Sequence, residues 1–168
     1  MGTHEHRKDA PRTLDVAVLT VSTTRGPAED RSGRWIRKRA EREGHRVVDY
    51  RIVSDDAEAI KSAVMDIIES HGPHAVLVNG GTGISPTDVT IEAIRPLFTK
   101  ELSAFGALFT HLSFEEIDSA AILSRATAGI IGHTAVFCMP GSLNACKLAC
   151  KNLVFPELGH VAGHILTG

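Results

Sequence analysis

The chain has 168 residues, of which 43% are hydrophobic and 23% are charged, and this composition is typical of a soluble globular domain. The formal net charge of −2 argues against nucleic-acid binding, since proteins of that class usually carry a basic excess. No apolar run is long enough to span a membrane, and three cysteines without a Cys-x-x-Cys pair indicate a reducing, cytoplasmic location.

The first thirteen residues, Met1 to Thr13, are polar and mixed in charge, and we expect them to form a flexible lead-in without a signal peptide. A single α/β domain is expected over residues 14–168. Its first strand is predicted over Asp15–Ser22, which is rich in valine. A hydroxyl-rich loop follows the strand, and we expect Asp30 or Ser32 to cap the next helix.

A second strand is predicted over Arg46–Val53, and the helix after it is expected to stop at Gly72-Pro73. The run Ala75–Val78 is apolar throughout, as in a strand buried on both faces. Directly after it comes Asn79-Gly80-Gly81-Thr82-Gly83, whose glycines permit positive φ and a close approach of backbone N–H groups to a ligand. This pattern is typical of phosphate binding in α/β proteins, although a tight turn that needs glycine only for its shape has the same pattern.

The second half of the chain is predicted to be mainly helical. A helix is expected to begin near Asp88 and to break at Arg95-Pro96, and the apolar spacing of Leu97–Phe114 indicates another. Ser113 to Glu116 has the pattern of a further helix start, and Ala120–Leu123 is a short strand-like run. The remaining predictions are a strand over Thr134–Met139 and helices over Ala145–Leu153 and Pro156–Leu166.

This alternation of strands and helices predicts an α/β sandwich with a mainly parallel sheet. In such sheets the loops at the carboxyl ends of the strands lie along one edge, where ligands bind. Four polar or glycine-rich loops follow apolar runs, namely Ser22–Arg25, Ser54–Asp56, Gly80–Asp88 and Pro140–Asn144. We therefore expect these loops to meet and to form a ligand site.

Two acids lie in those loops, and they indicate a cation. A carboxylate repels a phosphate unless a cation lies between them, so Asp55 and Asp88 beside a phosphate loop indicate Mg²⁺ and a phosphoryl or nucleotidyl transfer. Capping is equally compatible with Asp55, in a capping box with Glu58, and Asp88 has the same alternative. Arg125, after the strand-like run, could clamp a phosphate or cap a sheet edge.

Several motifs resemble the molybdenum cofactor biosynthesis MoaB/MogA family, and the resemblance covers nearly everything after Thr13. The motifs are Leu-Thr-Val-Ser at Leu19–Ser22, Asp-Arg-Ser-Gly at Asp30–Gly33, Gly-Gly-Thr-Gly at Gly80–Gly83, Asp-Val-Thr at Asp88–Thr90, Leu-Ser-Phe-Glu-Glu-Ile at Leu112–Ile117, Ser-Arg-Ala at Ser124–Ala126 and Met-Pro-Gly-Ser at Met139–Ser142. The stretch Ser113–Ile117 is more similar to the MoaB branch than to the MogA branch. The resemblance implies a three-layer α/β/α molybdopterin-binding fold, usually assembled as a homotrimer or homohexamer.

The resemblance also implies a molybdopterin adenylyltransferase. Such an enzyme transfers AMP from ATP to the terminal phosphate of molybdopterin with Mg²⁺ and releases pyrophosphate, and a downstream metal-insertion protein then uses the product. The two functional aspartates of the family correspond to Asp55 and Asp88, which would be catalytic and hold Mg²⁺. The residues expected to bind the substrates are Ser22, Gly80, Gly81, Thr82, Gly83, Ser113, Arg125, Pro140, Gly141 and Ser142.

Two positions depart from the family pattern. Thr87 stands where many relatives have an arginine before the loop aspartate, and Leu143 stands where many have a second proline. Because some members named B have lost activity, the alternative is a non-catalytic molybdopterin-binding or carrier protein of the same pathway. A third alternative is an assembly protein that uses the apolar face of Leu97–Phe114, which ordinary core packing explains more simply. Both aspartates are present, so we expect an active enzyme, of a molybdenum or a tungsten pathway.

Overall fold

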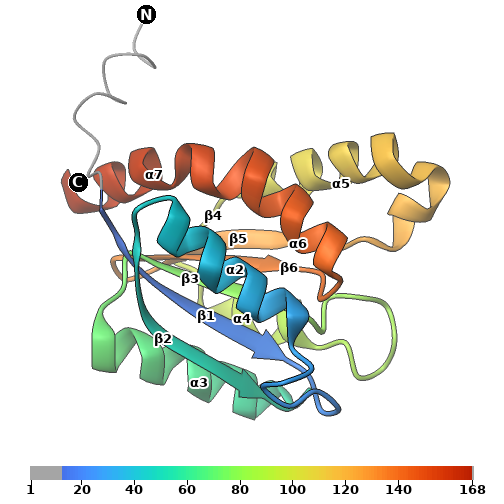
Figure 1. The fold of residues 1–168 in the computed structure, drawn as a ribbon, viewed down its shortest axis with the longest axis horizontal. Helices are drawn as coiled ribbons and strands as arrows, with labels where there is room; N and C mark the ends of the chain where they lie inside the picture. Colours follow the sequence, from blue (N-terminus) through green and yellow to red (C-terminus); the bar gives the residue numbers. More distant parts are fainter. Residues whose placement is uncertain (1–12, 168) are drawn as a thin grey trace, which may run out of the picture.

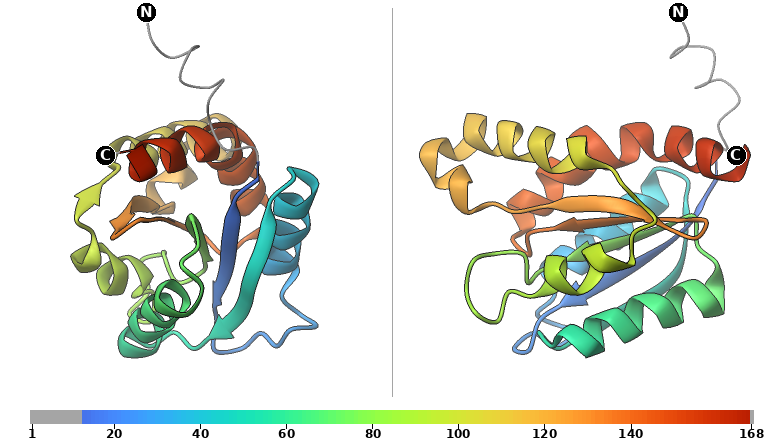
Figure 2. Two further views of the ribbon diagram at one scale, coloured as in Figure 1. Left: turned by 90° about the vertical axis from the view of Figure 1, so that its left-hand side faces the viewer. Right: turned by 180° about the vertical axis from the view of Figure 1, so that it is seen from behind.

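The computed structural model describes residues 13–167, which form a six-stranded sheet between two layers of helices (Figure 1, Figure 2). The strands are β1 (Asp15–Val21), β2 (Arg46–Val53), β3 (Ala75–Asn79), β4 (Lys100–Glu101), β5 (Thr127–Ile131) and β6 (Thr134–Met139). The α-helices are α2 (Arg31–Arg42), α3 (Ala57–His71), α4 (Thr90–Ile94), α5 (Ser103–Ile117), α6 (Leu143–Ala149) and α7 (Phe155–Thr167). Shorter helical turns are η1 (Arg95–Leu97), η2 (Asp118–Leu123) and η3 (Cys150–Val154). The predicted lead-in lies outside the described residues, apart from Thr13.

The sheet has the strand order β2-β1-β3-β6-β5-β4. Parallel pairing joins β1 to both β2 and β3, and β3 to β6, whereas β5 is antiparallel to both of its neighbours. The predicted mainly parallel sheet is therefore confirmed. Because β1, β2, β3 and β6 run in one direction, the loops after them share one edge, at the right in Figure 1. The chain goes from β1 to its neighbour β2 and then to β3 on the other side of β1. The sheet therefore has a topological switch point between β1 and β3, a place where ligands commonly bind in such sheets.

Two apolar clusters, one on each face of the sheet, hold the layers together. Successive residues of β1 point to opposite faces, so Val18 joins the cluster under α2, α5, α6 and α7, and Leu19 joins the cluster under α3 and α4. Phe109 and Ile67 are fully buried helical members of the first and the second cluster. The three-layer sandwich implied by the resemblance is thus observed. Within residues 13–167, none of the helices has the length and apolar character needed to cross a membrane.

The helix predicted over Leu97–Phe114 is wrong in its first third. The chain there forms η1 and the short strand β4, and α5 begins only at Ser103. Pairing with β5 overrides the helical spacing: Thr99 N donates to the carbonyl of Ile130, and the N–H of Leu102 donates to β5, both at 2.8 Å. Strand β5 itself was not predicted, because its sequence includes Gly129 and its strand character comes from its neighbours.

Two further predictions in this region are also wrong. Ser113 starts no new helix, because α5 runs through it to Ile117 and buries it. The strand-like run Ala120–Leu123 belongs to the 3₁₀ turn η2. Asp118, at the junction, has φ 51° and ψ −139°, which reverses the chain and lays η2 beside the end of α5.

The two predicted C-terminal helices are nearly continuous. They are joined by η3, a π-helical turn over Cys150–Val154, and α7 then begins at Phe155. Pro156 has no N–H and would clash with the carbonyl four residues earlier in a regular α-helix. The wider π turn directly before it accommodates the proline.

Candidate phosphate-binding site

The four loops that follow the parallel strands meet at one edge of the sheet, as the sequence predicts. The loops after β1 and β2 touch where Thr23 donates from N and Oγ1 to Asp55 Oδ2, at 2.7 and 2.8 Å. The loops after β3 and β6 touch where Gly80 N donates to Met139 O at 3.0 Å. They are packed so closely that a Cβ on Gly141 would lie 3.0 Å from Gly80 Cα.

The first two glycines of the loop are required by its shape. Gly80 and Gly81 have φ of 99° and 65°, the left-handed region that side chains disfavour. A Cβ on Gly80 would overlap the backbone carbonyl of Val21, and one on Gly81 would overlap Thr90 Oγ1. Glycine is therefore required at these two positions for the shape of the turn. That shape also fixes the directions of the polar groups of the loop.

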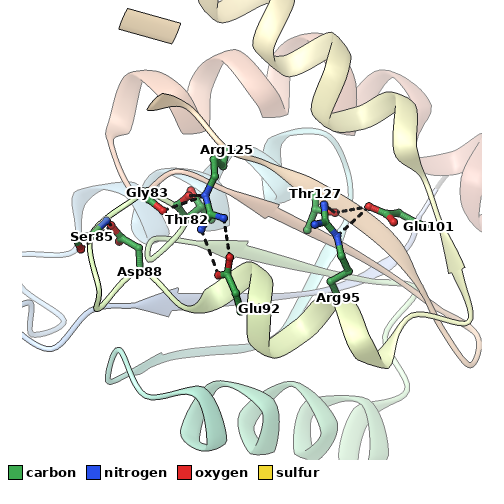
Figure 3. Close-up of polar contacts among 9 residues, drawn as sticks. All are labelled: Thr82, Gly83, Ser85, Asp88, Glu92, Arg95, Glu101, Arg125 and Thr127. Carbon is green, nitrogen blue, oxygen red and sulfur yellow. Dashed lines mark hydrogen bonds and ion pairs between the residues drawn. The ribbon is translucent and has the colours of Figure 1, made fainter. Parts of the chain in front are cut away.

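All four carbonyl groups of the glycine loop, Gly80–Gly83, are bound by protein donors. Thr90 takes the first two, because its Oγ1 donates to the first at 2.8 Å and its N–H to the second at 3.0 Å. Arg125 takes the last two, because its Nε donates to them at 2.9 and 3.0 Å (Figure 3). By contrast, the last three N–H groups of the loop donate to no acceptor in residues 13–167. A loop whose carbonyls are already bound and whose amides are unpaired has the hydrogen-bonding capacity to bind an anion.

Two buried polar atoms at the base of this loop also lack partners within the described residues. They are Asn79 Oδ1 and Thr82 Oγ1. Buried polar atoms in native proteins are rarely left unpaired, so these two have hydrogen-bonding capacity that a ligand or an ordered water would satisfy.

Asp55 does not cap the following helix, so the predicted capping box is wrong. The N-cap of α3 is Asp56, whose Oδ1 accepts from Ala59 N at 2.8 Å. Asp55 Oδ2 is held by Thr23, whereas its Oδ1 accepts no hydrogen bond from the described chain. That second oxygen lies 3.5 Å from the position of a Cβ on Gly81, so it is beside the glycine loop.

Asp88 is arranged in the same way on the other side of the loop. It does not cap α4, whose N-cap position is Val89 and has no side-chain cap. Asp88 Oδ2 accepts from Ser85 N at 2.9 Å and from Ser85 Oγ at 2.8 Å, and it lies 2.6 Å from the position of a Cβ on Gly83 (Figure 3). Each aspartate thus has one oxygen fixed by an amide and a hydroxyl and a second oxygen that accepts none in the part of the chain described.

The two carboxylates at this edge suit Mg²⁺, which needs few protein ligands, better than they suit a metal ion whose ligands all come from the protein. Residues 13–167 contain no group of three or more His, Cys, Asp or Glu side chains that could hold a metal ion. Two carboxylates leave coordination positions for phosphate oxygens and water, which is the usual environment of Mg²⁺.

The cysteines are all buried, and burial raises the pKa of Cys138 and Cys146 to about 12, so these thiols stay protonated and are not ligands or nucleophiles.

Arg125 joins the glycine loop to Glu92 of α4 by hydrogen bonds. In addition to the two loop carbonyls, its Nη1 donates to Glu92 Oε1 at 2.6 Å (Figure 3). The hydrogen bond from Arg125 lowers the pKa of Glu92. The structure therefore brings Arg125 to the glycine loop, with its donors engaged by carbonyls and a carboxylate.

Of the other expected substrate-binding residues, four lie in the loops at this edge of the sheet and one, Ser113, lies on α5. Ser22 Oγ accepts from the N–H three residues on at 3.2 Å, and Ser142 caps α6 in the same manner at 3.2 Å. Gly141 and Pro140 form the turn beside Gly80. Ser113 is buried on α5, and no hydrogen bond within residues 13–167 joins it to the glycine loop.

A buried network beneath the site was missed by sequence reasoning. Asp30 is fully buried, and its Oδ2 accepts from Thr20 Oγ1 at 2.6 Å and from Tyr50 OH at 2.7 Å. Asn79 Nδ2 donates to Thr20 Oγ1 at 2.9 Å. Burial and the bond to Asp30 raise the pKa of Tyr50 above its ordinary range. The sequence had pointed to two of these residues in other ways, since Thr20 and Asp30 lie in family motifs and Asp30 was one of two expected helix caps. The capping role is confirmed, because Asp30 Oδ1 accepts from the third residue of α2.

Comparison with known proteins agrees with these observations. Residues 17–160 match the family model described as a probable molybdopterin binding domain. The chain is 49% identical over 166 residues to molybdenum cofactor biosynthesis protein B of Bacillus subtilis (strain 168), covering 98% of each. It is similar to a crystal structure of molybdenum cofactor biosynthesis protein B, with a TM-score of 0.92 and 43% identity over 95% of this chain and 100% of that chain. It is also similar to the tungsten cofactor synthesizing protein MoaB from Pyrococcus furiosus, with a TM-score of 0.85 and 42% identity over 93% and 99%. The chain therefore belongs to the molybdopterin-binding-domain family of molybdenum cofactor biosynthesis proteins, as its motifs predict.

Proposed function

We propose that the protein acts in molybdenum cofactor biosynthesis as a molybdopterin adenylyltransferase, which transfers AMP from ATP to the terminal phosphate of molybdopterin with Mg²⁺. One observation carries the proposal: the glycine loop has its carbonyls bound by the protein and three amides unpaired within residues 13–167, and an aspartate oxygen faces it from each side. Family membership supports the pathway.

Each part of the site has a task in such a reaction. The unpaired loop amides would bind the phosphates of ATP. Mg²⁺ held by Asp55 and Asp88 would neutralise charge on those phosphates. Thr23 and Ser85 fix one oxygen of each aspartate, which orients the other. Thr90 and Arg125 hold the loop carbonyls away from a polyanion that would otherwise be repelled by them.

The transfer itself needs no nucleophile from the protein. An oxygen of the molybdopterin phosphate attacks the α-phosphorus of ATP and forms the new P–O bond. The bond from that phosphorus to the bridging oxygen breaks, and its electron pair leaves with pyrophosphate. Because the attacking phosphate is already ionised, the protein contributes positioning and charge compensation.

Two adjacent aspartates provide a matched test of this mechanism. We expect Asp55→Asn to lower the rate of adenylyl transfer at least about a hundredfold, the usual effect of losing an electrostatic group in an active site, and Asp88→Asn to do the same. Asp56→Asn should keep the wild-type rate, because asparagine caps a helix as well as aspartate. Adenylylated pterin and pyrophosphate would be measured with ATP, molybdopterin and Mg²⁺, and the unfolding midpoint would check the fold. A full rate in either of the first two variants removes that acid from the mechanism.

A non-catalytic molybdopterin-binding or carrier protein of the same pathway is the second candidate. Thr87 favours it, because this exposed residue beside Asp88 is not basic, and its Oγ1 lies 3.1 Å from Ser85 Oγ. Molybdopterin binding without pyrophosphate release would establish the carrier, and turnover would exclude it. In both cases we propose that a downstream metal-insertion protein receives the pterin and that the chain forms a homotrimer or homohexamer.

A further inference from the structure

We propose that Arg25 binds the β- and γ-phosphates of the nucleotide and then the pyrophosphate that leaves. This inference rests on the proposed function and assigns a residue that neither the motifs nor the expected substrate contacts include. The loops after β1, β2, β3 and β6, which cover residues 22–30, 54–56, 80–89 and 140–142, carry several acids. Arg25 is the single Lys or Arg within those four loops.

Arg25 lies where the ends of β1, β3 and β6 meet. It belongs to the loop after β1, but its Nη1 donates to the carbonyl of Gly141, after β6, at 3.2 Å. A Cβ on Gly141 would lie 3.5 Å from that Nη1 and 3.0 Å from Gly80 Cα. The guanidinium is therefore beside the first residue of the glycine loop. Its backbone is fixed as well, since Arg25 N donates to Ser22 Oγ at 3.2 Å.

The same side chain also borders an open hollow at the Asp55 end of the site. The hydroxyl residues Ser22, Thr23 and Ser54 line this hollow together with Arg25. Thr23 is the residue that holds Asp55. Arg25 thus borders both the start of the glycine loop and the hollow next to Thr23, the residue that holds Asp55. The outer phosphates of a nucleotide bound at this edge would need a positive charge there.

The present contact of Arg25 can be given up without leaving a group unpaired. The carbonyl of Gly141 also accepts from Ser32 Oγ, at the shorter distance of 2.8 Å. The side chain of Arg25 is exposed, and its Nε and Nη2 donate to no residue in the described chain. Arg125 differs, because releasing it would strip two carbonyls of the glycine loop and the Glu92 carboxylate of their partner. Arg25 is therefore the guanidinium that can turn to a phosphate and bind two of its oxygens at once.

The chemistry of the leaving group gives this residue its effect. When the bond between the α-phosphorus and the bridging oxygen breaks, negative charge gathers on pyrophosphate. A guanidinium beside that group stabilises the charge and also binds free pyrophosphate after the transfer. Since Arg25 would contact the outer phosphates alone, it should affect ATP and pyrophosphate and leave molybdopterin affinity unchanged.

Calorimetric titration of the full-length protein with pyrophosphate and Mg²⁺ tests the proposal without reference to turnover. We expect Arg25→Gln to weaken the affinity at least about tenfold, as the loss of a charge-assisted bidentate contact implies. The affinity of Arg25→Lys for pyrophosphate should lie between those of the wild type and Arg25→Gln, because lysine keeps the positive charge but cannot bind two oxygens with a planar guanidinium. Arg31→Gln is the matched control, since this exposed residue of α2 makes no side-chain hydrogen bond within the described chain, and it should bind as the wild type does.

Equal affinities of the wild type and Arg25→Gln would overturn the inference, and so would a wild type that binds no pyrophosphate. Turnover then separates it from the proposed function. A wild type that makes adenylylated pterin, with an Arg25→Gln variant unchanged in KM for ATP and in pyrophosphate affinity, contradicts Arg25 alone. A protein that binds pyrophosphate through Arg25 and makes no product supports Arg25 and contradicts the adenylyltransferase. The unfolding midpoint of each variant controls for misfolding.

Discussion

Arg125, which binds the glycine loop, also forms an ion pair with Glu92, and the contribution of this ion pair to stability depends on pH. Arg125 hydrogen-bonds the Glu92 carboxylate, and this bond, more than any other cause, lowers the pKa of Glu92 below its ordinary 4.5. A carboxyl whose pKa is lower in the folded state stabilises the fold above its unfolded pKa, and the contribution is lost as the pH falls through the folded value. The Glu92 side chain is 53% exposed, so solvent screening keeps the contribution small.

Removing the charge of Glu92 should therefore lower the free energy of unfolding near neutral pH, and this effect should disappear in acid. We expect Glu92→Gln to lower the free energy of unfolding by about 0.5 kcal/mol at about pH 7 and to leave it unchanged at about pH 3. Urea unfolding of both proteins at the two pH values measures the difference. Glu116→Gln, at an exposed position of α5, should match the wild type at both. A difference for Glu92→Gln that persists in acid would show that the charge is not its cause.

At the residue scale, sequence reasoning succeeded where local geometry decides and failed where a distant contact does. The tight turn at Gly80 and Gly81 could be predicted from the sequence, because residues other than glycine rarely adopt the positive φ that both have. Asp55 and Asp56 are adjacent acids before one helix, and no local pattern tells which one caps it. The choice is made by Thr23, 32 positions away, which binds Asp55 and leaves Asp56 to the helix.

The end of α5 carries a strained residue whose relief can be measured. Asp118 has φ 51° and ψ −139°, a combination that glycine adopts without steric cost and other residues pay about 1–3 kcal/mol to adopt. We expect Asp118→Gly to raise the free energy of unfolding by about 1 kcal/mol, since the relief exceeds the extra entropy of glycine in the unfolded chain. Chemical denaturation measures it. Asp118→Ala keeps the Cβ and should gain nothing, and a gain as large as that of glycine would rule out backbone strain.

At the element scale, strands marked by apolar and aromatic residues in their own sequence were predicted, and those defined by pairing were not. Arg46–Val53 and Thr134–Met139 were predicted with their observed bounds, because valine and isoleucine or aromatic residues mark them. Strand β5 is short and includes Gly129, where the ring of Phe98 occupies the space of a Cβ. That packing, and the hydrogen bonds from Thr99 and Leu102, fix the strand from outside its own sequence.

At the scale of the whole molecule, the site follows from topology more than from any motif. Three parallel pairings bring together loops that are far apart in the sequence, with Thr23, Asp55, Gly81 and Gly141 at one edge. The order of strands along the sheet was not predicted, but the shared direction was sufficient to place the loops. This explains why the four loops were placed correctly, whereas Ser113, a residue of α5 that lies in none of those loops, has no hydrogen bond to the site within the described residues.

The outer surface of α5 and η2 makes the proposed assembly testable. These two elements contact each other, and they expose four large apolar side chains, Phe114, Ile117, Ile122 and Leu123, which are 56, 48, 83 and 53% exposed. Exposed apolar patches of this kind mark association surfaces, and in a homotrimer or homohexamer we expect the copies to meet at this patch. Burial against another copy would offset the cost of keeping these side chains in water.

Light scattering after size-exclusion chromatography gives the mass of the assembly. We expect a trimer or hexamer for the wild type and a smaller species for Ile122→Glu, because a buried unpaired carboxylate would cost more than the contact contributes. Leu166→Glu is the matched control, since Leu166 is 55% exposed and lies on α7 outside the patch, so its mass should be that of the wild type. A monomeric wild type would contradict the assembly. An unchanged mass for Ile122→Glu would place the interface on another face, because burying an unpaired carboxylate at the most exposed of the four side chains would destabilise the contact.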